Sequence, residues 1–272
     1  MAFGKLGLLG MGCGLGLLAG LTAPDAALAC GQESDCALGD RSFRILLPDS
    51  GEPRGAIIFA HGYRGSAAGT MRNEGLTGLV DQLNVALVAL EGVNGIWNTP
   101  NNPGAGEREG DEFAYVDALS DRLEEEWGIP AERTVVSGFS GGAMLVWNIA
   151  CERGDEYAGF APLSGTFWDP IPENCPTVPN NLIHFHGTQD EVVPLEGRMI
   201  RTTMQGDVHE ALKMLLEKSD FGAEEVVEEG GVECRARRDS EDRLLEFCTF
   251  PGGHGYRPEF VAEAVEEFLP KG

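Results

Sequence analysis

The strongest constraint on the fold is the alternation of short apolar runs with longer segments of helical character. We expect strands at residues 42–47, 56–60, 85–90, 134–137, 160–163, 182–185 and 244–250. Helical patterns lie at residues 112–127, 142–151, 203–219 and 258–268. This alternation predicts an α/β fold with a mostly parallel sheet that helices cover on both faces. Functional residues are then expected at the carboxyl ends of the strands.

The first 29 residues have the layout of a secretory signal peptide. A short basic start ends at Lys5, residues 6–21 are apolar and rich in glycine, and Ala27-Leu28-Ala29 forms an A-x-A cleavage site. A transmembrane anchor is the alternative, but a run of 16 residues is short for a bilayer core. Acylation of Cys30, as in a lipoprotein, is a lesser alternative, because the position three residues before it holds alanine where leucine is usual.

We therefore expect residues 1–29 to be removed and residues 30–272 to form one mature domain. Such a domain would be secreted or periplasmic, without stable membrane insertion after cleavage. The chain holds 44 Asp and Glu residues against 20 Lys and Arg residues, a net charge of −24. Because binding to phosphates depends on Lys and Arg, this balance argues against nucleic acid and anionic membranes as partners.

Six cysteines follow Ala29, an even number that suits disulfides in an oxidising compartment. Six cysteines allow 15 connectivities, and among these we expect neighbours to pair. The expected pairs are Cys30 with Cys36, Cys151 with Cys175, and Cys234 with Cys248. The last pair has further support, because strands at 234–238 and 243–250 that fold back on each other place its two cysteines opposite. No C-x-x-C or Cys-His cluster has zinc-ligand spacing, so we expect no metal.

A candidate nucleophile lies in the G-x-S-x-G pattern formed by Gly138, Ser140 and Gly142. The β-branched pair Val135-Val136 leads into the pattern, and a helix-compatible run follows it. This strand-turn-helix context is the one that holds a serine on a strained turn with its hydroxyl exposed. A purely structural glycine-rich turn is the alternative. We expect Ser140 to be a nucleophile.

A serine nucleophile requires a histidine base and a carboxylate that orients the histidine. In hydrolases with this strand-turn-helix the chain order is serine, acid, histidine. Asp190 follows the strand at 182–185 and is the expected acid. His254 lies in a glycine-rich loop after the strand at 244–250 and is the expected base, so activity should rise with pH as His254 loses its proton. His209 falls in a helical pattern, where a solvated surface histidine is expected.

Two backbone N–H groups are expected to form the oxyanion hole. One belongs to Gly141, the residue after the nucleophile. The second is assigned to Tyr63, in the loop that follows the strand at 56–60. His61 precedes the serine in the chain, so we expect it to brace this loop and not to act as the base.

Four separated segments of the chain agree with one enzyme family. They are Phe59-Ala60-His61-Gly62-Tyr63, Gly138-Phe139-Ser140-Gly141-Gly142-Ala143-Met144, His186-Gly187-Thr188-Gln189-Asp190 with Val192-Val193-Pro194, and Gly252-Gly253-His254. With Arg41-Ser42-Phe43-Arg44, they resemble the secreted esterases grouped as polyhydroxybutyrate depolymerase and feruloyl or acetylxylan esterase relatives.

The resemblance covers nearly the whole mature chain. It implies an α/β-hydrolase fold, a Ser-Asp-His triad and hydrolysis of carboxylic esters without a cofactor. It maps the nucleophile to Ser140, the acid to Asp190, the base to His254 and the oxyanion loop to residues 61–64. Many relatives carry Thr-Trp-Pro after the base, whereas Gly255-Tyr256-Arg257 follows it here, so this wall of the pocket departs from the family pattern.

The substrate pocket is expected to be open. Ser164 and Leu182 are only 18 positions apart, which leaves no room for a large cap domain. Side chains on loops could line the pocket and contact an aromatic or hydroxyacyl group, although ordinary loop packing is an equal alternative for each. The candidates are Arg64, Trp97, Trp168 and Tyr256.

The expected function is that of a secreted serine esterase. Its substrates would be hydroxyalkanoate oligomers or phenolic or acetyl esters. A serine peptidase or an acyltransferase on the same fold is the alternative within enzymes. A non-catalytic binding protein is disfavoured, because such proteins usually lose a triad member and here all three positions are filled.

Overall fold

A computed structural model of the chain describes residues 1, 2, 4, 30–104 and 111–270. The predicted signal peptide, with its cleavage site Ala27-Leu28-Ala29, lies outside the described residues apart from positions 1, 2 and 4. Among the described residues, no helix is both long enough and apolar enough to cross a bilayer.

The centre of the fold is a ten-stranded sheet in the described part of the chain. Its strands are β1 (Cys36–Leu38), β2 (Arg41–Leu46), β3 (Ala56–Ala60), β4 (Ala86–Leu90), β5 (Thr134–Phe139), β6 (Gly159–Leu163), β7 (Asn181–Gly187), β10 (Glu225–Glu229), β11 (Val232–Arg238) and β12 (Leu244–Phe250). A separate small hairpin is formed by β8 (Met199–Ile200) and β9 (Thr203–Met204).

The strand order is β1-β2-β4-β3-β5-β6-β7-β12-β11-β10. The six strands from β4 to β12 in this order run parallel, and antiparallel pairs extend the sheet at both edges. The predicted mostly parallel sheet is therefore confirmed. The parallel register brings the carboxyl ends of β3, β5, β7 and β12 to one edge of the sheet, which the loops carrying the candidate site residues then leave.

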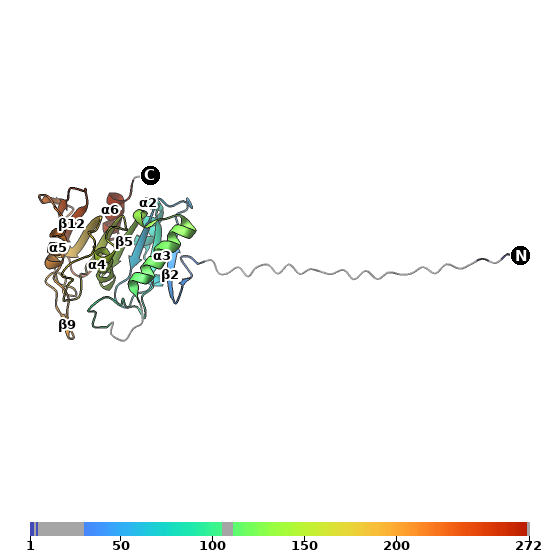
Figure 1. Cartoon of the computed structure of the whole chain (residues 1–272), viewed down its shortest axis with the longest axis horizontal. Coiled ribbons are helices and arrows are strands. Elements are labelled where there is room, and N and C mark those ends of the chain that lie inside the picture. The colour runs from blue at the N-terminus through green and yellow to red at the C-terminus, as the bar shows by residue number, and fades with distance from the viewer. Residues whose placement is uncertain (3, 5–29, 105–110, 271–272) are drawn as a thin grey trace.

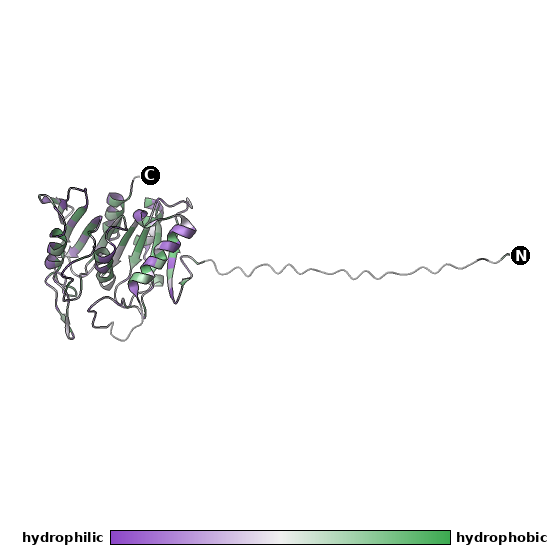
Figure 2. Ribbon diagram, in the orientation of Figure 1, coloured by the Kyte–Doolittle hydropathy of each residue, from purple (hydrophilic) through white to green (hydrophobic). Residues whose placement is uncertain are grey.

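Helices cover both faces of the sheet (Figure 1). They are α1 (Ala67–Met71), α2 (Glu74–Leu83), α3 (Glu112–Trp127), α4 (Gly141–Glu152), α5 (Val208–Leu216) and α6 (Pro258–Phe268), with a 3₁₀ turn at Ala131–Arg133. The helices α3, α4 and α5 bury apolar side chains in one cluster, and α1, α2 and α6 bury theirs in a second. The strands between these layers are largely hydrophobic, whereas hydrophilic residues lie on the outer sides of the helices (Figure 2).

The sequence places one helix start wrongly. The pattern at 203–219 predicts a helix from residue 203, but Thr203 and Met204 form β9 and α5 begins only at Val208. The physical reason is the N-cap, since the Asp207 side chain accepts hydrogen bonds from the N–H groups of His209 and Glu210.

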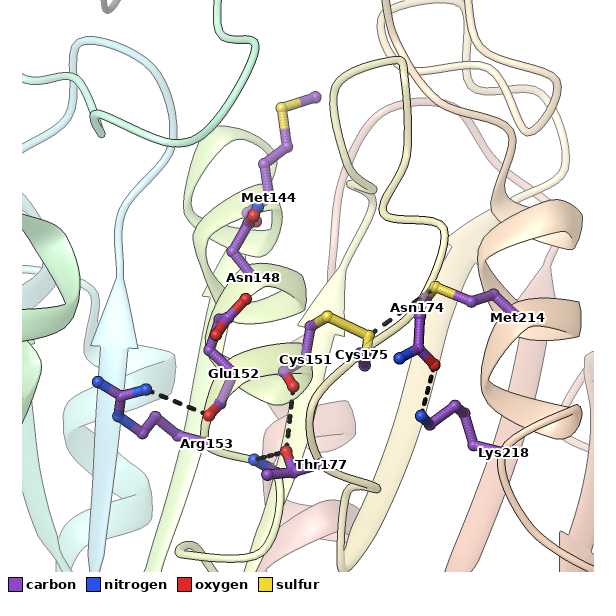
Figure 3. The surroundings of a disulfide bond; sticks show 11 residues. Met144, Asn148, Cys151, Glu152, Arg153, Asn174, Cys175, Thr177, Met214 and Lys218 are labelled. Carbon is purple, nitrogen blue, oxygen red and sulfur yellow. Dashed lines mark hydrogen bonds between the residues drawn. A yellow bond between two sulfur atoms is a disulfide. The ribbon is translucent and has the colours of Figure 1, made fainter.

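Three disulfides join the cysteines in the pairs that nearest-neighbour spacing favours. Cys234 and Cys248 are direct partners in the register of β11 and β12, as the predicted fold-back requires. Cys151, near the end of α4, is linked to Cys175 in the loop before β7 (Figure 3). Figure 3 also shows Met144 toward the other end of α4, so the disulfide anchors the end of this helix that is remote from Ser140.

Candidate active site

Ser140 occupies a strained turn between the end of β5 and the start of α4. Its backbone angles are φ 56° and ψ −117°, a conformation that non-glycine residues rarely adopt. The turn is fixed by hydrogen bonds from Ser140 N–H to the Leu163 carbonyl at 2.9 Å and from Met144 N–H to the Ser140 carbonyl at 3.0 Å. The surrounding structure thus holds the Ser140 side chain at the carboxyl edge of the sheet, where the sequence pattern predicts it.

The two glycines of the motif are required because backbone segments approach closely on both sides of the turn. A Cβ atom on Gly142 would stand 2.0 Å from the carbonyl oxygen of Ala60, at the end of β3. A Cβ on Gly138 would stand 2.8 Å from Gly142 and 2.9 Å from the same Ala60 oxygen. Real Cβ atoms do not approach backbone this closely, so larger residues would displace α4 from the sheet.

Substitution of Gly142 by alanine should lower the free energy of unfolding by more than about 3 kcal/mol, because the new methyl group meets immovable backbone. Urea denaturation measures this change. The matched control is Gly78→Ala in α2, where nothing lies within 4 Å of the new methyl group. This control should gain about 0.5–1 kcal/mol. A Gly142→Ala protein as stable as the parent would contradict the close approach of α4 to β3.

Ser140, His254 and Asp190 form one continuous line of hydrogen bonds. The Oγ of Ser140 lies 2.9 Å from Nε2 of His254, and Nδ1 of His254 lies 2.7 Å from Oδ2 of Asp190. The three residues lie on the loops after β5, β12 and β7. In the sequence, His254 is 114 positions from Ser140 and 64 positions from Asp190. The order is that of a nucleophile, a base and an orienting carboxylate.

The Asp190 carboxylate is buried and has a full set of donors. Its Oδ1 accepts the N–H groups of Val192 and Val193, both at 2.8 Å. Burial alone would raise the pKa of Asp190, but hydrogen bonds from His186, His254 and the Val193 N–H outweigh it and lower the pKa below its ordinary value. Asp190 therefore remains ionised beside His254.

A second histidine supports the loop that carries Asp190. The Nε2 atom of His186 lies 2.7 Å from the Val193 carbonyl and 3.4 Å from Oδ2 of Asp190. The Nδ1 atom of His186 lies 2.9 Å from Nε2 of His184. The His184 ring is fully buried, and this burial lowers the pKa of His184 well below its usual value. Sequence reasoning used His186 only as part of a motif. Its alternation with His184 on β7, which puts both rings on one face of the strand, is the signal that could have identified this support.

Tyr63 and Gly141 lie side by side, as an oxyanion hole requires. A Cβ built on Gly141 would be 3.5 Å from the Tyr63 nitrogen. In the described part of the chain, no backbone carbonyl accepts a hydrogen bond from either N–H. The Tyr63 loop is anchored because the N–H of the next residue, Arg64, donates to the Gly95 carbonyl at 2.8 Å.

His61 braces this loop from below. Gly92 N–H donates to His61 Nε2 at 3.1 Å, so the proton of the neutral ring lies on Nδ1, which donates to the Gly62 carbonyl at 2.8 Å. Burial lowers the pKa of His61, which favours this neutral form. The His61 carbonyl accepts the Trp97 indole N–H at 2.7 Å. The ring is therefore engaged in holding the loop.

A cavity of about 1000 Å³ opens beside Ser140. Three loop residues that the sequence analysis names line this cavity. They are the pocket candidates Trp97 and Trp168 and the expected oxyanion donor Tyr63. Arg64 and Tyr256 do not belong to the lining. The Arg64 guanidinium stacks on the Tyr63 ring at 5.1 Å, and Tyr256 packs behind the site, 5.0 Å from the Phe139 ring and hydrogen-bonded by Asn73.

One wall of the cavity was not predicted. The segment around β8 and β9 contributes Arg198, Ile200, Arg201 and Gln205 to the lining. The available signal was the occurrence of two arginines three positions apart, shortly after the predicted acid, in a strongly acidic chain. No element is predicted between Asp190 and the helix expected from residue 203, so neither arginine is assigned to the site from sequence.

The model of the family described as Phospholipase/Carboxylesterase matches residues 112–220. NocK of Nocardia uniformis subsp. tsuyamanensis, a protein named as an esterase, is 31% identical over 147 residues, which are 54% of this chain and 43% of NocK. Feruloyl esterase C of Emericella nidulans is 27% identical over 166 residues, 59% of this chain and 58% of that protein. The chain thus spans about half the length of these relatives.

The chain has the α/β-hydrolase fold and is similar to carboxylesterases. Among solved structures, acetyl xylan esterase from Aspergillus awamori gives a TM-score of 0.62 at 13% identity and covers 86% of this chain and 98% of its own. A phospholipase/carboxylesterase from Dyadobacter fermentans gives 0.58 at 17% identity, with 86% and 99% covered. At these identities the likeness shows the fold alone, and the expected α/β-hydrolase fold is confirmed. The family match includes Ser140 and Asp190, whereas His254 lies beyond it.

Proposed function

We propose that this protein is an exported serine esterase that hydrolyses carboxylic esters through Ser140, His254 and Asp190. The observation that carries the proposal is the line of hydrogen bonds from Ser140 Oγ through His254 to Asp190, at 2.9 and 2.7 Å, beside an open cavity. Relationship to carboxylesterases supports the same chemistry.

In the proposed reaction the Oγ of Ser140 attacks the ester carbonyl carbon while its proton passes to Nε2 of His254. The negative charge that forms on the carbonyl oxygen is stabilised by the N–H groups of Tyr63 and Gly141. His254 then gives the proton to the leaving alcohol, and an acyl group remains on Ser140. Water attacks this acyl-enzyme by the same steps in reverse and releases the acid.

Asp190 has two tasks in this mechanism. It keeps the His254 proton on Nδ1, so that Nε2 is free to accept the serine proton, and it stabilises the imidazolium that forms. The lowered pKa of Asp190 supports both tasks, because the carboxylate stays ionised to a lower pH than an ordinary aspartate does. Protonation of Asp190 should therefore contribute no step to the pH profile of kcat near the usual pKa of an aspartate.

Export is the second element of the proposal. The signal-peptide features of residues 1–29 and the three disulfides of the described chain support an oxidising location, secreted or periplasmic, for a catalytic domain at 30–272. The described segment between Ser164 and β7 contains no helix, so the cavity has no large cap over it from this side and suits bulky or oligomeric esters.

The test combines covalent labelling with a substrate panel. A fluorophosphonate should label the protein once, and peptide mass spectrometry should place the label on Ser140, since only an activated serine reacts. The panel contains short 3-hydroxybutyrate oligomers, methyl ferulate, acetylated xylan and p-nitrophenyl esters of increasing acyl length. At least one ester should turn over without added metal or cofactor. Labelling at another serine, or an absence of turnover across the panel, would remove the proposal.

A further inference from the structure

The cavity beside Ser140 has a cationic wall in a strongly acidic protein. Arg198 and Arg201 line it, and no Asp or Glu does so among the described residues. Acidic residues outnumber basic ones by 44 to 20 in the whole chain. The charged residues that line the cavity in the described part of the chain are therefore all positive, although the chain as a whole is strongly acidic.

Among the described residues, no carboxylate forms an ion pair with either arginine. Several other arginines pair closely with acids, as Arg41 does with Glu112 and Arg153 with Asp117, both at 3.0 Å. The described residues offer Arg198 only a backbone partner, the Val192 carbonyl, which accepts its Nε–H at 2.7 Å. Arg201 has neither an ion pair nor a hydrogen bond from its side chain within the described ranges. Both guanidinium groups keep donors for a ligand.

The backbone conformation of Arg201 is also unfavourable. It begins the turn between β8 and β9 with φ 58°, in the left-handed region where glycine or asparagine would be more stable. An arginine serves no purpose in forming this turn. Retention of a strained residue in a cavity wall is a reason to consider a role in binding.

Two buried polar atoms on the same wall have no hydrogen-bond partner within the described part of the chain. They are Nε1 of Trp168 and Oε1 of Gln205, in side chains that belong to residues 9% and 4% exposed. The two residues are joined by an antiparallel bridge, which connects the β9 end of the hairpin to the loop after β6. Both line the cavity. A buried indole N–H without an acceptor is destabilising unless a ligand supplies one.

We propose that Arg198, Arg201 and the indole N–H of Trp168 bind a carboxylate carried by the ester substrate, away from the bond that is cleaved. Arginine forms paired N–H···O bonds with carboxylates, and an indole N–H adds a donor of fixed direction. The substrate class is then an ester of which one end is a free acid, such as a dicarboxylic half-ester or a short hydroxy-acid oligomer. This inference rests on the proposed esterase function and narrows it.

The experiment compares matched anionic and neutral esters. One pair carries the charge on the acyl side, monoethyl adipate against ethyl hexanoate. The other carries it on the alcohol side, 3-butyryloxybutyrate against its primary amide. At pH 7.5 the anionic member of at least one pair should have a kcat/KM about tenfold higher, which corresponds to about 1.4 kcal/mol.

Variants at Arg201 then test whether the arginines of the cavity cause the preference for the anionic esters. Arg201→Gln should reduce the ratio of kcat/KM between the two members to near one, and Arg201→Lys should restore part of it, because lysine keeps the charge but not the paired donors. The control is Arg133→Gln, which removes the same charge at the amino end of β5, the far edge of the sheet from Ser140. The control should keep the full ratio.

The outcomes separate this inference from the proposed function. Turnover of the neutral esters without any preference for the anionic members would overturn the carboxylate site and leave the esterase standing. Equal losses on both members in Arg201→Gln would do the same. If no ester turns over, binding of monoethyl adipate to the Ser140→Ala protein by calorimetry still decides: binding that Arg201→Gln weakens about tenfold supports the site, and no binding overturns it.

Discussion

The Ser140→Ala protein is expected to lose at least about 10⁴-fold in kcat on every ester that the parent hydrolyses. The reason is that this change removes the only atom that can form the acyl-enzyme, while the Tyr63 and Gly141 N–H groups and the cavity remain. Because those groups bind the ester before the reaction, KM should change little. Steady-state rates with saturating ester, and a fluorophosphonate labelling assay in parallel, measure the loss.

A suitable control for this variant is Ser240→Ala. Ser240 is exposed in the turn between β11 and β12, where its hydroxyl donates to Asp220, and it should retain parental rates. Far-UV circular dichroism and the urea midpoint establish that Ser140→Ala is folded, which is expected because alanine adds no atom to the turn and removes only the Oγ contact with His254. A folded Ser140→Ala protein with parental kcat would end the proposed mechanism.

The Asp190→Asn protein is expected to lose about 10³- to 10⁴-fold in kcat through the position of one proton. The N–H groups of Val192 and Val193 both point at Oδ1, so the asparagine must place its oxygen there. Its NH₂ group then occupies the place of Oδ2 and donates to Nδ1 of His254. That forces the His254 proton onto Nε2, where the ring can no longer accept the proton of Ser140.

We expect Asp190→Asn to change only kcat and the position of the proton on the His254 ring. A nitrogen-resolved NMR spectrum of His254 would show the proton on Nε2 in the variant and on Nδ1 in the parent at neutral pH. The control Asp49→Asn removes the same charge from an exposed loop residue before β3 and should change neither the spectrum nor the rate. If Asp190→Asn kept the parental tautomer and rate, the orienting role of Asp190 would be wrong.

Much of the fold follows from the sequence because the central elements are long or strongly patterned. The bounds of β3, α3 and α6 agree with the apolar runs that predict them. No helix is predicted in the segment from His61 to Leu83, although α1 and α2 lie in it, because glycines interrupt its helical pattern. Strand β10 was also missed, since its five residues are all exposed and carry no alternation of apolar and polar side chains.

The candidate site was predictable to the extent that chain order determines it. The positions of Ser140, Asp190 and His254 follow from the motif and from the sequence of strands, and the structure brings these side chains into contact. The lining of the cavity did not follow in the same way. Trp97 and Tyr256 are both aromatic loop residues, yet one lines the cavity and the other packs behind Phe139, which depends on loop paths that local sequence does not encode.

The disulfide between Cys151 and Cys175 determines whether the protein falls apart when a protease cleaves it between these two residues. Its ring encloses β6 and the loop that bears Trp168, and exposed residues such as Glu173 and Asn174 lie within it. A protease that cuts at those residues would leave the two fragments covalently joined, with Ser140 on one and His254 on the other. The nicked protein would run as one band without reductant and as two with it, so the protein can be cleaved there and stay in one piece.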